Sequence, residues 1–234
     1  LSWLGAMLSG PETLIDDRGR RIFWGWLRDA RAWEETGWNS IMTLPWHFTP
    51  AQDNSLKIDP VEELRSLRYD EKHHDDVTLS AGEEVVVDGF TSDCMEIKLT
   101  IEPGAATQFG MKLLCSDNGE EETVITYETQ KEQFVIDFEN ASEEEIDYPC
   151  GRMLLTSGSL KQTIPYALAG NEVLNFDIFV DRSVIEIFVN SDICMVQRVY
   201  PMRKDSKQFR LFASDGKIAA KNIVKWDMDA TNPW

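Results

Sequence analysis

The sequence predicts an all-β protein whose longer, C-terminal part is a two-sheet antiparallel β-sandwich. From about residue 77 onward, short segments alternate apolar and polar residues, which is the period of a strand with one buried face. Met95 to Ile101 shows this pattern, with an apolar side chain at every second position. Turn-forming Asp, Asn, Gly and Ser residues separate the segments at the spacing expected of a sandwich. The same alternation recurs over residues 109–113, 134–138 and 209–213.

The first segment, residues 1–58, is rich in aromatic side chains and contains six of the eight tryptophans. Asp16-Asp17-Arg18-Gly19 is a turn signal, and the apolar run from Ile22 to Leu27 after it predicts a strand. These two features indicate a β-hairpin with a sheet neighbour on each side.

Residues 59–76 are predicted to connect the first segment to the sandwich. Asp59 as N-cap, Pro60 at the first helical position and Glu62 three residues after the cap predict a short helix. The polar run from Tyr69 to Asp76 is expected to be a solvated linker. The predicted divisions are therefore residues 1–68, 69–76 and 77–234.

The stretch from Phe176 to Asn190 predicts a second β-hairpin. Each of its strands places three aliphatic or aromatic side chains on one face, as half-buried strands do. Asp181, Arg182 and Ser183 supply the turn between the strands. The aligned apolar residues are Phe176, Ile178 and Val180 on the first strand and Ile185, Ile187 and Val189 on the second.

The composition opposes several classes of partner. The 234 residues include 41 acidic and 23 basic side chains, a formal net charge of −18. Nucleic acids and anionic membranes both require a basic surface, so neither is expected as a partner. The sequence contains no apolar run of the roughly 18 residues that a transmembrane helix needs. It shows no signal-peptide pattern either, and both a secreted and a cytoplasmic location stay open.

The four cysteines are widely spaced and form neither a Cys-x-x-Cys pair nor a Cys/His cluster, so no metal site is expected. Thiols in the sandwich core are the main interpretation, and a disulfide between the sheets is the alternative. These residues are Cys94, Cys115, Cys150 and Cys194.

Four motifs resemble glycoside hydrolase family 32, the invertases, inulinases and levanases. The hairpin Phe176 to Asn190 resembles the hallmark of the family's C-terminal sandwich. Gly19 to Trp26 resembles a strand in the last blade of its catalytic β-propeller, and Gly37-Trp38 with Met42 to Pro45 resembles the next segment of that blade. Asp59 to Arg68 resembles the element that joins propeller to sandwich. The resemblance implies a partial β-propeller, its last blade, followed by the sandwich.

The motifs that carry this family's catalysis are missing from the sequence: Asn-Asp-Pro with the nucleophile, Arg-Asp-Pro, and Glu-Cys with the acid/base. Arg28-Asp29-Ala30 is the nearest match and lacks the proline. The resemblance therefore implies the C-terminal part of a retaining hydrolase of β-fructosides such as sucrose, inulin or levan. We assign no catalytic residue and expect no cofactor. The expected partners are a fructose-containing carbohydrate, bound through the whole enzyme, and the missing part of the propeller.

Trp24, Trp26 and Arg28 are the candidate substrate-binding residues. They alternate along one strand and so share a face. The resemblance places this blade at the wall of a fructose-binding funnel, where an indole can lie against a sugar ring. The alternative is that both tryptophans pack the blade. Arg28 is expected to reach sugar hydroxyls.

The charged residues of the second hairpin, Asp181, Arg182, Ser183 and Glu186, are expected to be structural by the same resemblance. The first three set the turn, and Glu186 faces solvent or the propeller. One departure from the family is visible, because Trp46 comes after Leu44-Pro45 where an arginine is usual.

Two further hypotheses belong to other classes of protein. In the first of them, the sandwich is a non-catalytic carbohydrate-binding module. In the other, it is a self-associating domain whose unpaired blade strands join a second copy and form a homo-oligomer.

Overall fold

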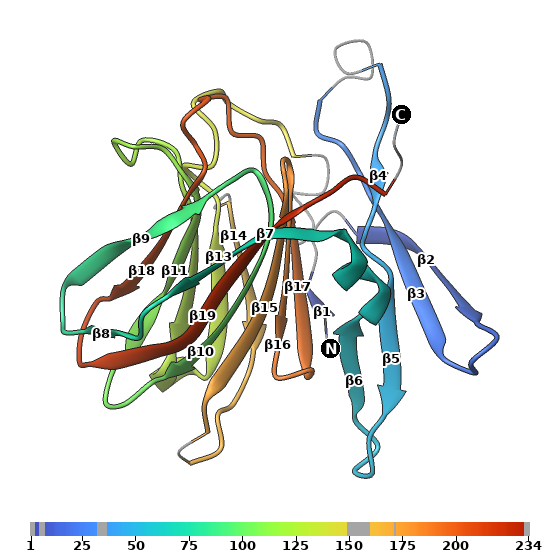
Figure 1. The fold of residues 1–234 in the computed structure, drawn as a ribbon, viewed down its shortest axis with the longest axis horizontal. Coiled ribbons are helices and arrows are strands. Elements are labelled where there is room, and N and C mark those ends of the chain that lie inside the picture. Colours follow the sequence, from blue (N-terminus) through green and yellow to red (C-terminus); the bar gives the residue numbers. More distant parts are fainter. Residues whose placement is uncertain (1–2, 5–7, 32–36, 149–159, 171, 232–234) are drawn as a thin grey trace.

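The computed structural model describes residues 3–4, 8–31, 37–148, 160–170 and 172–231, and these residues form three sheets stacked in layers (Figure 1). The pairing is antiparallel throughout, apart from the parallel contact of β1 with β17. The all-β prediction, with one short blade-like sheet followed by a two-sheet sandwich, is confirmed.

The N-terminal sheet has five strands in the order β2-β3-β5-β6, with β4 also paired to β3. It lies on the right of Figure 1, beside the sandwich. Its strands are β2 (Leu8–Ile15), β3 (Arg21–Leu27), β4 (Ile41–Met42), β5 (Trp46–Pro50) and β6 (Leu56–Pro60).

The middle sheet has eight strands in the order β1-β17-β16-β15-β10-β19-β7, with β8 paired to β19. Its strands are β1 (Trp3–Leu4), β7 (Arg68–His74), β8 (Val77–Leu79), β10 (Cys94–Glu102), β15 (Leu174–Asp181), β16 (Val184–Val189), β17 (Ile193–Arg198) and β19 (Ile218–Met228).

The outer sheet has six strands in the order β14-β13-β12-β11-β18-β9. Its strands are β9 (Glu83–Thr91), β11 (Gln108–Cys115), β12 (Thr123–Glu128), β13 (Gln133–Asp137), β14 (Lys161–Pro165) and β18 (Gln208–Ala213). A short 3-10 helix, η2 (Thr129–Lys131), separates β12 from β13.

The predicted hairpin Phe176 to Asn190 is present as β15 and β16, and both of its faces are buried. The predicted apolar face packs in the core between the middle and outer sheets. The opposite face belongs to a second apolar cluster, shared with the N-terminal sheet. Phe179, Val184 and Phe188 are the hairpin's contribution to that second cluster. The hairpin thus lies at the centre of a three-layer arrangement.

The connection between the N-terminal sheet and the sandwich differs from the prediction. Asp59 and Pro60 end strand β6, so neither begins a helix. The next element is a 3-10 helix, η1 (Glu62–Leu67), whose N-cap is Val61 and has no side-chain hydrogen bond. The expected linker, residues 69–76, is mostly strand β7, which pairs with β19 in the middle sheet. After the N-terminal sheet, the chain therefore enters the middle sheet at Arg68.

Candidate functional site at the junction of the N-terminal sheet and the sandwich

The predicted substrate-binding face lies on β3. Trp24 and Trp26 point to the side opposite the buried Phe23 and Leu27, as the alternation requires. Trp26 is 39% exposed, and the Arg28 guanidinium carbon lies 5.6 Å from its ring centroid. Trp24 is half-buried and packs against the second apolar cluster. The structure therefore brings Trp26 and Arg28 together on an accessible surface and leaves Trp24 as part of the packing.

Glu186 is a buried acidic group at the junction. Its carboxylate accepts a hydrogen bond from the backbone N–H of Leu44 and another from Nε1 of Trp46, each at 2.7 Å. Complete burial raises the pKa of Glu186 to about 7, although the two donors oppose this shift. Of the two orientations that the sequence left open, solvent or propeller, the side chain faces the N-terminal sheet.

The turn of the hallmark hairpin consists of Arg182 and Ser183, directly after Asp181 at the end of β15. Arg182 has φ +51°, and its backbone N–H donates to the carbonyl of Asp93 at 2.5 Å. A left-handed residue between two strands suits a tight hairpin.

A second buried link joins the two parts of the chain at Asp29 and Arg198. The Nη2 atom of Arg198 lies 2.7 Å from an Asp29 carboxylate oxygen, and neither side chain is more than 1% exposed. Burial alone would raise the pKa of Asp29, but the Arg31 backbone N–H and the Arg198 charge hold it below its ordinary value. The Tyr200 hydroxyl, next to this pair, accepts from the N–H of Ala30 at 2.8 Å.

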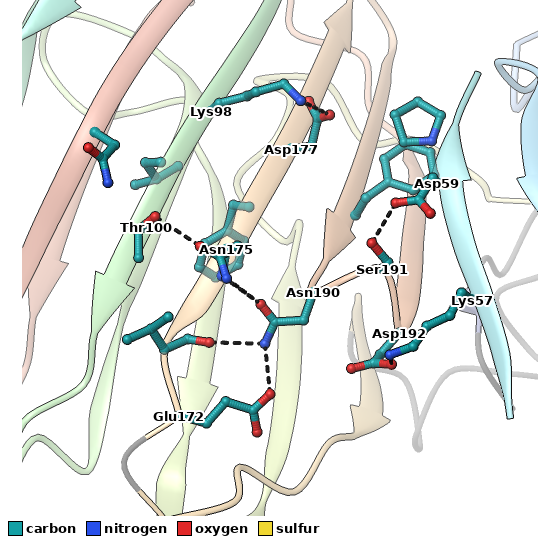
Figure 2. Close-up of a pocket in the computed structure, with 16 residues that line it drawn as sticks. Lys57, Asp59, Lys98, Thr100, Glu172, Asn175, Asp177, Asn190, Ser191 and Asp192 are labelled. Atoms are coloured by element: carbon teal, nitrogen blue, oxygen red, sulfur yellow. Dashed lines mark hydrogen bonds and ion pairs between the residues drawn. The ribbon is translucent and has the colours of Figure 1, made fainter. Parts of the chain in front are cut away.

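A polar hollow of about 620 Å³ lies beside this junction, between β6 and the ends of β10, β15 and β16 (Figure 2). Two contacts cross it from β6 to the β16–β17 turn: Ser191 donates to Asp59 at 2.5 Å, and Lys57 forms an ion pair with Asp192. Asn190 hydrogen-bonds along its floor to Asn175. We call this site the polar hollow and define it by the lining residues that Figure 2 draws as sticks.

One wall of the polar hollow carries a buried acidic group. Lys98 pairs with Asp177 at 2.6 Å. Burial and the nearby Glu96 carboxylate raise the pKa of Asp177. Carboxylates, amides and hydroxyls at such a site can hydrogen-bond a hydroxylated ligand. In the described part of the chain, no group of three or more His, Cys, Asp or Glu side chains is arranged to hold a metal ion.

Three of the cysteines are free thiols in the structure, and Cys150 lies outside the described residues. Burial raises the pKa of Cys94 to about 11 and that of Cys115 to about 12. Cys194 is completely buried in the second apolar cluster. None of the helices within the described ranges is long and apolar enough to span a membrane.

Comparison with known proteins defines the class. Residues 61–227 match the family model "Glycosyl hydrolases family 32 C terminal". The chain therefore belongs to glycoside hydrolase family 32 and contains its C-terminal domain, as the four motifs indicated.

Two curated relatives are similar along most of the chain. A sucrose-6-phosphate hydrolase of Zymomonas mobilis is 28% identical over 226 residues, which cover 92% of this chain and 40% of the relative. A levanase of Bacillus subtilis is 25% identical over 218 residues, 88% of this chain and 30% of the relative. The chain thus spans less than half the length of these relatives.

Solved structures share the fold at low identity. Fructan 1-exohydrolase IIa of Cichorium intybus, in complex with 1-kestose, has a TM-score of 0.79 at 16% identity, covering 97% of this chain and 49% of that one. A sucrose-6-phosphate hydrolase of Lactobacillus gasseri has a TM-score of 0.70 at 19% identity. This match covers 95% of the present chain and 41% of the Lactobacillus gasseri chain. These matches extend over the N-terminal sheet as well as the sandwich.

Proposed function

We propose that this chain is the C-terminal portion of a retaining hydrolase of β-fructosides, in which the sandwich holds the last propeller blade in place. The observation that carries the proposal is the continuous apolar cluster between the N-terminal sheet and the middle sheet. Two buried polar links, Glu186 with Trp46 and Arg198 with Asp29, cross the same boundary. Such a boundary is built like a protein core, which favours a rigid support over a hinge.

The substrate class rests on the relatives, whose names specify sucrose 6-phosphate, levan and fructan as substrates. All three contain a β-fructosidic bond. In the proposed enzyme, Trp26 and Arg28 contribute to the wall of the substrate site, with Trp24 packed behind them. Retaining hydrolysis requires two carboxyl groups about 5–5.5 Å apart, and we assign that pair to the propeller part outside this sequence.

Fructose release from sucrose, inulin and levan by the purified chain tests the proposal, with intact mass spectrometry excluding an accompanying fragment. We expect no turnover by the chain alone. Turnover would place a catalytic carboxylate pair within these 234 residues and would overturn the supporting role.

A second candidate function is carbohydrate binding by the sandwich, and the polar hollow of Figure 2 is the observation that favours it. Its amide and carboxylate groups suit a neutral, hydroxylated ligand. Titration of the chain with inulin-type oligosaccharides tests this function. Asn175→Ala, which removes an amide from the floor, should abolish any binding at this site.

Self-association is a third possibility, and strand β2 is the relevant feature. Within the described residues, β2 pairs on one side only, with β3, and much of it is exposed. An edge strand of this kind can pair with the missing blade or with a second copy. Static light scattering distinguishes a monomer from a dimer.

A further inference from the structure

A second hollow, of about 510 Å³, lies on the junction between the N-terminal segment and the loops of the sandwich. The chain carries 41 acidic and 23 basic residues, yet five basic side chains and a single acidic one, Asp93, line this hollow. We call it the cationic hollow. Its basic residues are Arg31, Arg182, Arg203, Lys204 and Lys207.

Two of these five cations have no acidic partner among the residues that the structure describes. Arg31, Arg203 and Lys207 form ion pairs with Asp29, Asp205 and Asp93, at 3.4, 3.1 and 3.2 Å. Arg182 and Lys204 are exposed, and neither forms an ion pair with any residue that the structure describes. Their charges are therefore available to an anion that enters the hollow.

A buried guanidinium adds to the positive potential at this place. Arg198 is completely buried, and its Nε and Nη1 atoms have no hydrogen-bond partner among the described residues. Its one carboxylate partner there, Asp29, also pairs with Arg31, so two guanidinium groups share a single carboxylate. Charge that is poorly compensated in a buried setting acts over a longer distance than the same charge in water.

Two aromatic side chains, Trp38 and Tyr200, also line the cationic hollow. The guanidinium carbon of Arg198 lies 5.8 Å from the Trp38 ring centroid and 5.2 Å from that of Tyr200. Arg31 lies over the Tyr200 ring at 4.7 Å. Aromatic faces beside cations provide a surface for an apolar ring face next to a site for negative charge.

From this combination we infer that the cationic hollow binds a phosphorylated sugar. The phosphate is held by Arg182 and Lys204, because guanidinium and ammonium groups form charge-assisted hydrogen bonds to phosphate oxygens. The C–H face of the sugar ring lies against Trp38, which is 43% exposed, whereas Tyr200 is only 2% exposed and is covered by the two arginines. This site differs from the polar hollow, whose carboxylates would repel a phosphate.

Isothermal titration calorimetry of the chain tests the inference with three probes: fructose 6-phosphate, inorganic phosphate and fructose. We expect fructose 6-phosphate to bind, inorganic phosphate to bind more weakly and fructose to show no heat. Added salt should weaken both phosphate-dependent reactions, because it screens the charges. Binding is measured without turnover, so its outcome is independent of whether the chain hydrolyses fructosides.

Matched variants distinguish the contribution of a cation to binding from the contribution of the aromatic ring. Lys204→Glu should weaken the binding of fructose 6-phosphate about tenfold or more, since it replaces a charge-assisted contact by repulsion. Lys217→Glu makes the same charge change at an exposed residue that does not line the hollow and should have no effect. Trp38→Ala should weaken fructose 6-phosphate about three- to tenfold and leave inorganic phosphate unchanged.

Three results would overturn the inference. Absence of heat with both phosphate compounds excludes an anion site. Equal losses in Lys204→Glu and Lys217→Glu place the binding elsewhere. Equal affinities for fructose 6-phosphate and inorganic phosphate, unaffected by Trp38→Ala, indicate a site for free phosphate only. Circular dichroism of each variant confirms that the fold is retained.

Discussion

The indole Nε1 of Trp46 donates a hydrogen bond to Glu186 Oε2 at 2.7 Å, across the boundary between the N-terminal sheet and the sandwich. The two residues are 140 positions apart in the sequence, and both are buried. An indole N–H is an uncharged donor. The bond therefore satisfies one carboxylate oxygen without supplying a positive charge, and no ion pair to Glu186 exists among the residues that the structure describes.

The raised pKa of Glu186 predicts a specific pH dependence of stability. The folded-state pKa of about 7 exceeds the ordinary value of 4.5, so the folded chain holds the proton that the unfolded chain releases between these values. This group's contribution is therefore fully present below about pH 4.5 and is lost as the pH rises toward 7. We expect the loss to be on the order of 3 kcal/mol.

Thermal melts of the native chain and of Glu186→Gln, from pH 5 to pH 8, check this prediction. The variant is less stable than the native chain at pH 5, because the glutamine cannot accept from both donors. The difference in Tm should narrow as the pH rises, and comparison of the two chains cancels the contributions of other titrating groups. A difference that stays constant or widens would show that Glu186 keeps an ordinary pKa.

Trp46→Phe should destabilise the chain by about 1 to 3 kcal/mol, because it leaves a buried carboxylate oxygen without its donor. Trp226→Phe is the matched control. The Nε1 of Trp226 also donates to a carboxylate, that of Glu71, at 2.7 Å, but on the exposed face of β19. We expect the control to cost less than about 1 kcal/mol, since water replaces the lost partner. Urea unfolding measures the free energy of unfolding of both variants. Equal losses of stability would argue against a special role for the buried hydrogen bond.

The Asp29–Arg198 pair makes a stronger prediction, because both partners are buried. Asp29→Ala should destabilise by about 3 to 5 kcal/mol, since it leaves an unpaired guanidinium in the interior. Glu102→Ala breaks the exposed pair of Glu102 with Lys221 and should cost at most about 1 kcal/mol. If Asp29→Ala unfolds no more readily than Glu102→Ala, solvent reaches Arg198 in solution.

The parts of the fold that could be predicted are those with a local signal. Residues 176–190 alternate because one face of the hairpin is buried in the sandwich core, and this pattern is visible without the structure. Strand β7 has no such signal: five of its seven residues are exposed, and it is held by backbone pairing to β19. Its polar sequence therefore resembled a linker. Asp59 resembled a helix cap because the residues around it in the sequence do not reveal that it pairs with His47 of β5.

The junction itself could be predicted only in part. The sequence left Glu186 with two orientations, and the choice depended on Leu44 and Trp46, more than 100 positions away. Asp29 drew attention only as part of an incomplete catalytic motif, and Arg198 drew none. Ile185 and Ile187 on either side of Glu186 indicate a buried carboxylate, whereas the neighbours of Asp29 are largely polar and give no such signal. In each case the partner of the buried charge is distant in the sequence, so the local pattern does not identify it.

Trp26 and Trp24 allow the two predicted roles of this strand face to be separated. Trp26 is 39% exposed, so Trp26→Ala should change the free energy of unfolding by less than about 1 kcal/mol, as exposed substitutions usually do. Trp24 packs against the second apolar cluster, so Trp24→Ala should cost about 2 kcal/mol or more. Urea unfolding of the two variants measures this contrast directly. Removal of an indole that contacts only substrate costs little stability, whereas removal of an indole that packs the blade costs much more. A large loss for Trp26→Ala would therefore assign Trp26 to the blade and remove it from the proposed substrate wall.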